Sequence, residues 1–231
     1  MKRIFTDFDG PIMDVSERYF QVYQFCLEKV KEPNQSVTPL TKSEFWELKR
    51  SQTPEPEIAI KSGLNLVNQP QNFTRLRREN INAKAFFAYD RLHPWAIKAL
   101  ETAQDFGIEL AVMTMRRESE LYPVLTRYDL HRFFPSDRIF CLKDDYLKTQ
   151  DIKDKPRLME RAIATLPTIQ NQWMVGDTEA DLIAGNCHNI PTIAVLSGIR
   201  NQTQLELHQP KAIAQDLTEA IKIIVEISRL S

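Results

Sequence analysis

The amino-terminal stretch MKRIFTDFDGPIMD brings two carboxylates, Asp7 and Asp9, to the end of an apolar run. Residues 2–8 have the composition of a β-strand that is covered on both faces. Burying a carboxylate costs free energy unless it is paired with a cation or bound to a metal ion. Asp7 and Asp9 fall on the same side of an ideal strand, and Gly10 allows the chain to turn directly after them. The pattern therefore indicates two carboxylates with a chemical role.

Further polar residues stand where other apolar runs end. Thr114 closes the run IELAVMT, and Asp177 closes QWMVGD, with Asp181 one helical turn later. Lys155 begins the helical pattern KPRLMERAIATL, which precedes the second of these runs. In open parallel sheets, ligands bind at the carboxyl ends of the strands. We therefore expect these side chains to share one pocket with the two amino-terminal aspartates.

This set of groups is suited to phosphoryl chemistry. Carboxylates from separate strands offer the hard oxygen ligands that Mg2+ prefers. A threonine hydroxyl and a lysine ammonium can bind phosphoryl oxygens. A carboxylate can act as a nucleophile and form an aspartyl-phosphate. If the chain turns at Gly10, a second aspartate two residues later can reach over as general acid and base. Mg2+ would reduce the repulsion between an anionic nucleophile and an anionic phosphate.

Strands and helices alternate over most of the chain, which predicts an α/β fold with a parallel sheet covered by helices. The predicted strands are residues 2–8, 108–114, 138–142, 172–177 and 191–196. The predicted helices are residues 94–107, 155–166 and 216–228. Pro94 and Gly107 are placed to begin and end the first helix. Asp216 and Glu219 form a capping-box pattern at the last one.

Residues 15–90 lack such strands, which predicts an all-helical insertion after the first strand. Apolar residues recur every three or four positions over 15–30, the period of an amphipathic helix. Asp14 is predicted to be the N-cap of this helix. Thr41 and Glu44 form a second capping-box pattern. The segments between the helical patterns are rich in proline, asparagine and glutamine, which predicts loops.

The chain has 231 residues, with 30 Lys and Arg against 31 Asp and Glu. This balance gives no electrostatic footprint for nucleic acid or an anionic membrane surface. No apolar run is long enough to span a bilayer or to form a signal peptide. Cys26, Cys141 and Cys187 show no metal-ligand spacing and are predicted to be small buried residues. We expect a reduced, cytoplasmic protein, a monomer or homodimer, with no nucleic-acid or membrane partner.

The segments DFDGPIMD, MTM, DKPRLME and VGDTEADLIAG resemble, in this order, the four motifs of the haloacid dehalogenase-like (HAD) hydrolase superfamily. The resemblance covers about residues 2–14 and 90–200 and is to its phosphoglycolate phosphatase-like members, which have an α-helical cap after the first motif. It implies a Rossmann-like parallel-sheet core, formed by residues 1–14 and 91–231, and an α-helical cap, formed by residues 15–90. The cap would close over the substrate.

The resemblance also implies a role for each residue of the set. Asp7 would be the nucleophile and Asp9 the general acid and base, while Thr114 and Lys155 would hold the phosphoryl oxygens. Mg2+ would be held by four aspartates: Asp7, Asp9 through its backbone carbonyl, Asp177, and Asp181 in a supporting or ligating position. An aspartate at position 9 favours phosphate-ester hydrolysis, because an alkoxide leaving group needs a proton donor. The implied function is a Mg2+-dependent phosphatase that acts on a small phosphorylated metabolite through an aspartyl-phosphate.

Two alternatives to this function are open. A phosphosugar mutase would use the same residues, and a non-catalytic regulatory or binding protein could keep the same fold, although the intact motifs argue against the latter. Two positions depart from the family pattern: Pro11 replaces a usual threonine, and Met115 replaces a small polar residue. Lys153 competes with Lys155 for the lysine role and is less favoured, because the family pairs this lysine with a proline.

Two groups of arginines have both a structural and a functional interpretation. Arg116 is a candidate for binding an anionic group of the substrate, although a solvated first helical turn is the favoured interpretation for Arg116 and Arg117. The cluster Arg75, Arg77 and Arg78 could recognise an acidic substrate, but the sequence favours a solvated helix face.

Overall fold

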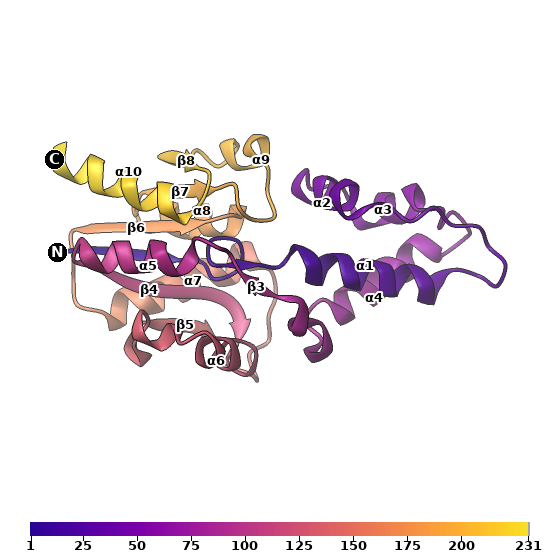
Figure 1. The fold of residues 1–231 in the computed structure, drawn as a ribbon, viewed down its shortest axis with the longest axis horizontal. Coiled ribbons are helices and arrows are strands. Elements are labelled where there is room, and N and C mark those ends of the chain that lie inside the picture. The colour runs from indigo at the N-terminus through magenta and orange to yellow at the C-terminus, as the bar shows by residue number, and fades with distance from the viewer. Residues whose placement is uncertain (231) are drawn as a thin grey trace. The chain divides into compact units, whose positions relative to one another are not determined.

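The computed structural model describes residues 1–230 and divides the chain into two compact units (Figure 1). The first unit comprises residues 1–14, 92–198 and the chain from Gln202 onward, and the second comprises residues 15–91 and 199–201. Most of the second unit is therefore an insertion in the sequence of the first. Within the described residues, no helix has the length and apolar character needed to cross a membrane.

A six-stranded sheet of parallel strands forms the first unit, in the order β5-β4-β1-β6-β7-β8. The strands are β1 (Lys2–Thr6), β4 (Ile108–Arg117), β5 (Ile139–Leu142), β6 (Asn171–Gly176), β7 (Thr192–Val195) and β8 (Ala212–Ala214). β1 lies between β4 and β6, and Thr6 is in register with Val112 and Val175. These three strands therefore deliver the residues that follow them to the same edge of the sheet.

Helices cover both faces of this sheet, as Figure 1 shows. They are α5 (Ala96–Asp105), α6 (Glu118–Arg127), α7 (Asp151–Thr165), α8 (Glu179–Cys187), α9 (Gln202–Glu206) and α10 (Leu217–Leu230), with the 3-10 helices η2 (Leu130–Arg132) and η3 (Ser136–Arg138). The neighbours Ile4 and Phe5 point to opposite faces of β1 and are both fully buried. One core cluster joins Phe5 and Met174 to Leu158 of α7. The α/β fold with a Rossmann-like parallel sheet is thus confirmed.

The second unit is helical in its regular elements. They are α1 (Ser16–Val30), α2 (Lys42–Arg50), α3 (Glu55–Lys61), α4 (Gln69–Asn80) and the 3-10 helix η1 (Lys84–Tyr89). Tyr23 of α1 stacks on Phe45 of α2, with 4.7 Å between the ring centroids, and both lie in one apolar cluster with Phe73 of α4. The two short strands β2 (Met13–Asp14) and β3 (Arg91–Leu92) pair where the chain passes between the units. That the second unit acts as a cap stays a prediction.

The predicted helix boundaries are partly correct. Thr41 and Glu44 form the expected capping box of α2. The prediction that Asp14 caps α1 is wrong, because Asp14 belongs to β2 and Val15 takes the N-cap position without a side-chain hydrogen bond. Pairing of β2 with β3 holds Asp14 in extended backbone. The helix therefore begins at Ser16, and the N-cap position falls on Val15, one residue after Asp14.

The last helix begins with a variant of the predicted cap. Asp216 Oδ1 accepts a hydrogen bond from the Glu219 N–H at 3.1 Å, as expected. The Glu219 carboxylate, however, accepts from the N–H of Gln215 at 2.6 Å, one residue before the position that a capping box requires. Pro94 lies just outside α5, whose N-cap position is Trp95.

The predicted strands are present, but two features differ. β4 continues to Arg117, beyond the predicted end at residue 114, and β8 was not predicted because its three residues are too few to show a pattern. The cysteine prediction holds for Cys26 and Cys141, whereas Cys187 at the end of α8 is exposed.

Candidate active site

Asp7 leaves the sheet directly after β1 and is buried, with 7% of its surface exposed. Its backbone N–H still donates to the carbonyl oxygen of Val175 at 2.8 Å, so the backbone stays fixed to β6. The Phe8 N–H donates to the Asp7 Oδ1 at 2.7 Å, which fixes the side chain as well. A central position in the sheet therefore determines where this carboxylate lies.

The turn after Asp7 explains the Pro11 departure. Gly10 has a φ of +89°, a conformation that disfavours any side chain. The Phe8 carbonyl accepts hydrogen bonds from the N–H groups of both Ile12, at 3.2 Å, and Met13, at 2.9 Å. The turn is thus closed without a hydrogen bond from position 11, where proline has no backbone N–H.

Asp177 and Asp181 come from the junction between β6 and α8. Asp177 directly follows β6 and is 3% exposed, and Asp181 is fully buried in the first turn of α8. Asp181 Oδ2 accepts from the backbone N–H of Thr178 at 3.0 Å and from its hydroxyl at 2.6 Å. The capping box of α8 therefore orients Asp181 while leaving its other oxygen for a second partner.

Glycines make room for these carboxylates. A Cβ atom at Gly198 would lie 1.9 Å from the Asp177 Oδ2, and one at Gly10 would lie 2.3 Å from the Asp177 Cγ. A Cβ atom at Gly176 would lie 2.1 Å from the Asp181 Cγ. Sequence reasoning missed Gly176 and Gly198, although each stands at or just beyond the carboxyl end of a predicted strand, the signal that identified the aspartates.

Lys155 connects the two strand ends. This residue of α7 is 1% exposed, and its Nζ lies 2.7 Å from the Asp7 Oδ2 and also forms an ion pair with Asp181. Burial alone would lower the pKa of Lys155, but the carboxylates of Asp181 and Asp7 raise it above its ordinary value. Lys153 is exposed and makes no such contact in the described structure. Lys155 is therefore the lysine of this cluster.

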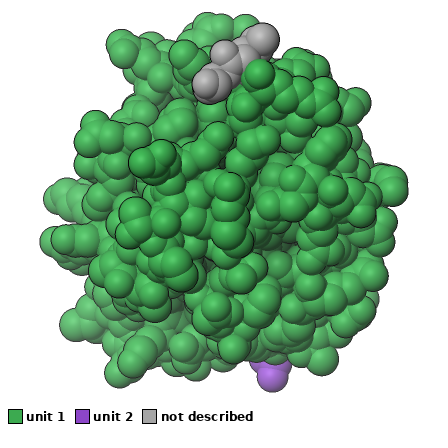
Figure 2. Space-filling model, turned by 90° about the vertical axis from the view of Figure 1, so that its left-hand side faces the viewer, with its two compact units in different colours: residues 1–14, 92–198, 202–231 green, residues 15–91, 199–201 purple. Residues whose placement is uncertain are grey.

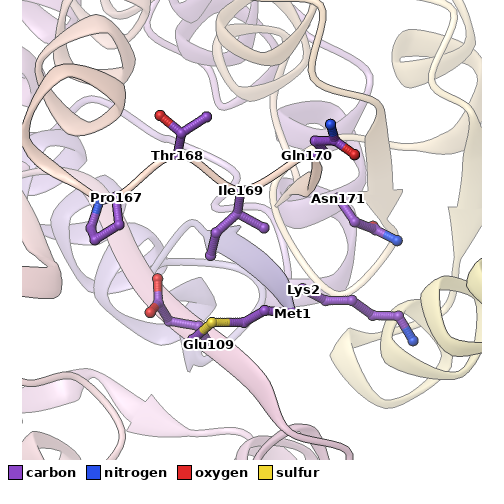
Figure 3. A pocket seen from close by; sticks show the side chains of 8 residues that line it. All are labelled: Met1, Lys2, Glu109, Pro167, Thr168, Ile169, Gln170 and Asn171. Carbon is purple, nitrogen blue, oxygen red and sulfur yellow. The ribbon is translucent and has the colours of Figure 1, made fainter.

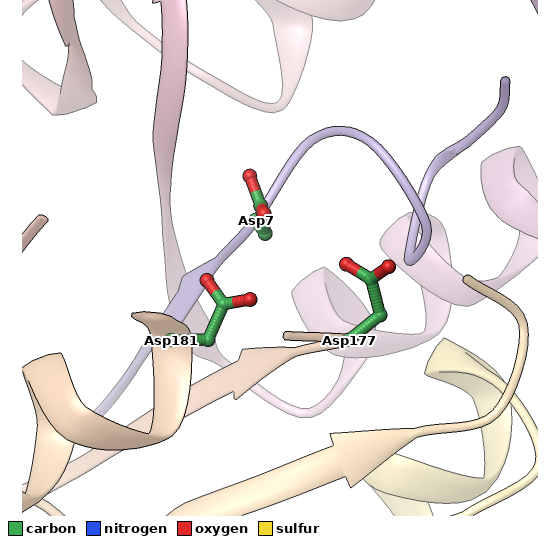
Figure 4. A group of neighbouring side chains, drawn as sticks. All are labelled: Asp7, Asp177 and Asp181. Atoms are coloured by element: carbon green, nitrogen blue, oxygen red, sulfur yellow. The ribbon is translucent and has the colours of Figure 1, made fainter. Parts of the chain in front are cut away.

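The side chains of Asp7, Asp177 and Asp181 are neighbours, and one carboxylate oxygen of each lies within 4.8 Å of the others (Figure 4). Burial raises the pKa of Asp7 well above its ordinary value; Lys155 opposes this effect, and the charges of Asp181 and Asp177 add to it. One ammonium does not balance three buried carboxylates. The donor set and the excess negative charge fit a divalent cation with hard oxygen ligands, such as Mg2+.

Thr114 lies on β4 just beyond the residues that pair with β1, and it is 2% exposed. Thr114 is not the last residue of the strand, because β4 continues to Arg117. The pairing with β5 is irregular here: Met113 pairs with Phe140 and Arg117 with Leu142. The Thr114 Oγ1 accepts a hydrogen bond from the Arg116 N–H at 3.2 Å. Met115 packs against the apolar core, so its departure from the family pattern serves packing.

Asp9 is paired with Arg116 rather than gathered with the other carboxylates. The Arg116 Nη2 lies 2.6 Å and the Nε 2.8 Å from the Asp9 Oδ1. The Arg116 side chain is 4% exposed and that of Asp9 is 29% exposed. The favoured prediction of a solvated helical turn is thus wrong for Arg116, because β4 extends through it and buries it. Arg117 ends the strand and donates to the carbonyl oxygens of Lys143 and Asp144.

The other arginine cluster is divided by the packing of α4. Arg77 is buried and lies 2.7 Å from the Glu55 Oε1, whereas Arg75 and Arg78 are exposed. The predicted solvated face is therefore correct for two of the three residues.

A cavity of about 570 Å3 lies at the opposite end of the strands. It is lined by residues at the beginnings of β1, β4 and β6, among them Lys2, Glu109 and Asn171 (Figure 3). Figure 2 views the first unit (green) from this end. None of the predicted site residues lines this cavity.

The fold and the site together define a Rossmann-like α/β protein with a lysine-bridged acidic site at the carboxyl edge of its sheet. The chain is similar to the haloacid dehalogenase-like hydrolases, and the HAD-hydrolase-like family model matches residues 153–220. The chain is 27% identical over 136 residues to a phosphoglycolate phosphatase of Agrobacterium fabrum, a match that spans 59% of this chain and 56% of that protein.

Two further proteins are similar to the chain. Pyrophosphatase PpaX of Oceanobacillus iheyensis is 22% identical over 151 residues, which cover 65% of this chain and 67% of that protein. The solved structure of a haloacid dehalogenase-like family hydrolase from Streptococcus pneumoniae matches with a TM-score of 0.69 and 20% identity, over 96% of this chain and 98% of that one. This last match shows the shared fold.

Proposed function

We propose that the protein is a Mg2+-dependent phosphatase that hydrolyses a small phosphorylated metabolite through an aspartyl-phosphate on Asp7. The observation that carries the proposal is the buried cluster of Asp7, Asp177, Asp181 and Lys155 at the carboxyl edge of the sheet. The names of the relatives, a phosphoglycolate phosphatase and a pyrophosphatase, support a small phosphorylated substrate.

In the first step, a carboxylate oxygen of Asp7 attacks the phosphorus of the ester, and the bond from phosphorus to the leaving oxygen breaks. The hydrogen bond from the Phe8 N–H and the Lys155 ammonium hold this carboxylate in place. Asp9 gives its proton to the leaving oxygen, which departs as an alcohol. Asp9 is suited to this role because its carboxylate lies apart from the buried trio and is partly exposed.

In the second step, water attacks the phosphorus of the aspartyl-phosphate and the bond to Asp7 breaks. Asp9, now a carboxylate, accepts the proton of the water, and inorganic phosphate leaves. This step regenerates both aspartates and balances the reaction.

The remaining residues bind the phosphoryl group and the cation. Thr114 and Lys155 supply a hydroxyl and an ammonium for the phosphoryl oxygens, and Arg116 is a candidate for the same task. The cation would be held by Asp7, Asp177, the Asp9 backbone carbonyl and Asp181. When bound, Mg2+ neutralises charge between the nucleophile and the phosphate.

The second unit would act as the cap over this site, with substrate selectivity residing in residues 15–90. A cytoplasmic location fits the three cysteines, which form no disulfide.

Phosphate release from p-nitrophenyl phosphate, with and without Mg2+, tests the proposal. We expect Mg2+-dependent turnover that Asp7→Asn abolishes, and an increase in thermal stability with Mg2+ that Asp177→Asn removes. Asp137→Asn changes an exposed aspartate and serves as the control. Undiminished activity of Asp7→Asn would exclude this nucleophile. Isomerised phosphosugar without free phosphate would identify a mutase instead.

A further inference from the structure

Arg116 makes a contact that the proposed roles do not require. Its Nη2 and Nε both reach the same oxygen of Asp9, at 2.6 and 2.8 Å. Two N–H groups on one oxygen restrict the side-chain torsions of Asp9 more than a single contact does. Asp9, the proposed proton donor and acceptor, is thus held in place by the guanidinium of Arg116.

The Arg116 side chain is itself fixed. It is 4% exposed, and its guanidinium lies over the Phe8 ring, 5.2 Å from the centroid. Its backbone N–H donates to the Thr114 hydroxyl, so a single residue links the candidate phosphoryl-binding threonine to Asp9. Arg116 lies in the segment where the pairing of β4 with β5 is irregular, between Met113 and Arg117.

We propose that Arg116 is a positioning residue for Asp9 in the second step of the reaction, an inference that rests on the proposed phosphatase function. In that step the water oxygen attacks phosphorus, the phosphorus–oxygen bond to Asp7 breaks with its electron pair going to Asp7, and the water proton goes to Asp9. Arg116 holds the Asp9 carboxylate where it can accept this proton.

A pre-steady-state experiment with p-nitrophenyl phosphate separates the two steps. The p-nitrophenolate leaving group departs without protonation, so the first step is insensitive to Asp9 and appears as a burst of one p-nitrophenolate per active site. The second step then sets the steady-state rate. For Arg116→Met we expect an unchanged burst rate, a steady-state kcat that falls on the order of tenfold to a hundredfold, and accumulation of phosphorylated protein.

Three further variants make the result specific. Asp9→Asn should show the same pattern more strongly, and adding Arg116→Met to it should cause no additional loss, because both changes remove one function. Arg116→Lys keeps the charge without the planar fork and should recover part of the steady-state rate. Arg117→Met is the matched control, because Arg117 binds the carbonyl oxygens of Lys143, Asp144 and Tyr146, and it should leave the ratio of burst to steady-state rate unchanged.

The outcomes distinguish this inference from its alternatives. Losses that add in the double variant, or equal slowing of the burst and the steady state, would overturn the positioning role. If Arg116→Met needed a higher substrate concentration than wild type to reach half of the maximal burst rate, Arg116 would be assigned to substrate binding instead. The burst amplitude counts the folded active sites, so partial misfolding does not affect the rates per site. A wild-type protein that releases no p-nitrophenolate would overturn the proposed function itself, and the inference with it.

Discussion

The ammonium nitrogen of Lys155 lies 2.7 Å from the Oδ2 of Asp7, and the same nitrogen pairs with Asp181. The three residues come from α7, the end of β1 and the start of α8, so this contact joins three separate parts of the chain. It also sets the charge of the site, because one buried cation faces several buried anions. Removing a single charge from such a group leaves its partners without compensation, which is strongly unfavourable.

Replacing Lys155 with methionine should therefore destabilise the metal-free protein. We expect a loss of about 3–5 kcal/mol in the free energy of unfolding at neutral pH, because the buried carboxylates lose their counter-charge. Added Mg2+ should restore part of this loss by binding the folded state. Urea unfolding with and without MgCl2 measures both effects. Lys153→Met alters an exposed lysine of the same helix and should stay within about 0.5 kcal/mol of wild type; equal losses for the two variants would contradict the assignment.

Replacing Gly198 with alanine should weaken metal binding without touching a ligand. The added Cβ would lie 1.9 Å from the Asp177 Oδ2, so the carboxylate has to move. We expect Mg2+ affinity, measured by calorimetry, to fall about 10- to 100-fold, the range seen when the support of a ligand is lost. Gly107→Ala is the control: Gly107 has a φ of +65° and no atom within 4 Å of the new Cβ. It should lower stability by about 1 kcal/mol and leave Mg2+ affinity unchanged.

We expect the free energy of unfolding to depend on pH because of Lys49 in the second unit. Burial, together with the charge of Arg77, lowers the pKa of Lys49 from 10.5 to about 8, despite its ion pair with Glu55. Between about pH 8 and 10.5 Lys49 is protonated in the unfolded chain but not in the folded chain, so the free energy of unfolding rises with pH in this range. Below about pH 8 Lys49 is charged in both states, and the full free-energy cost of burying its charge is present. Lys49→Met should remove this rise and should be more stable at pH 7 by up to roughly 3 kcal/mol.

Chemical unfolding from pH 7 to 10.5 measures this difference between the variant and the wild type. Lys42→Met, which changes a lysine of the same helix whose side chain is 42% exposed, should keep the wild-type slope. A slope that is unchanged in Lys49→Met would show that Lys49 stays protonated throughout this range.

Much of the fold and of the candidate site follows from local sequence. The apolar strands that precede Asp7 and Asp177 can be predicted because both faces of a parallel sheet are buried, and such strands are continuous apolar runs. Parallel strands place their carboxyl ends at one edge, so a residue's position just after its strand is enough to predict its neighbours there. The choice of Lys155 over Lys153 came from the resemblance to the family, which pairs this lysine with a proline.

Other contacts depend on pairing between distant segments. Arg116 contacts Asp9, which lies 107 residues away in the sequence, and the residue types around Arg116 do not reveal this partner. Pairing of β2 with β3 removed Asp14 from its expected cap, and the packing of α4 buried Arg77 while leaving Arg75 exposed.

The sequence by itself thus determined the α/β class and the groups that meet at the sheet edge, because hydrophobic period and strand ends are local properties. Only the tertiary structure decided that Arg116 holds Asp9 and that Lys155 bridges Asp7 and Asp181. Those contacts arise from strand register and helix orientation, which are fixed by the packing of segments far apart in the chain.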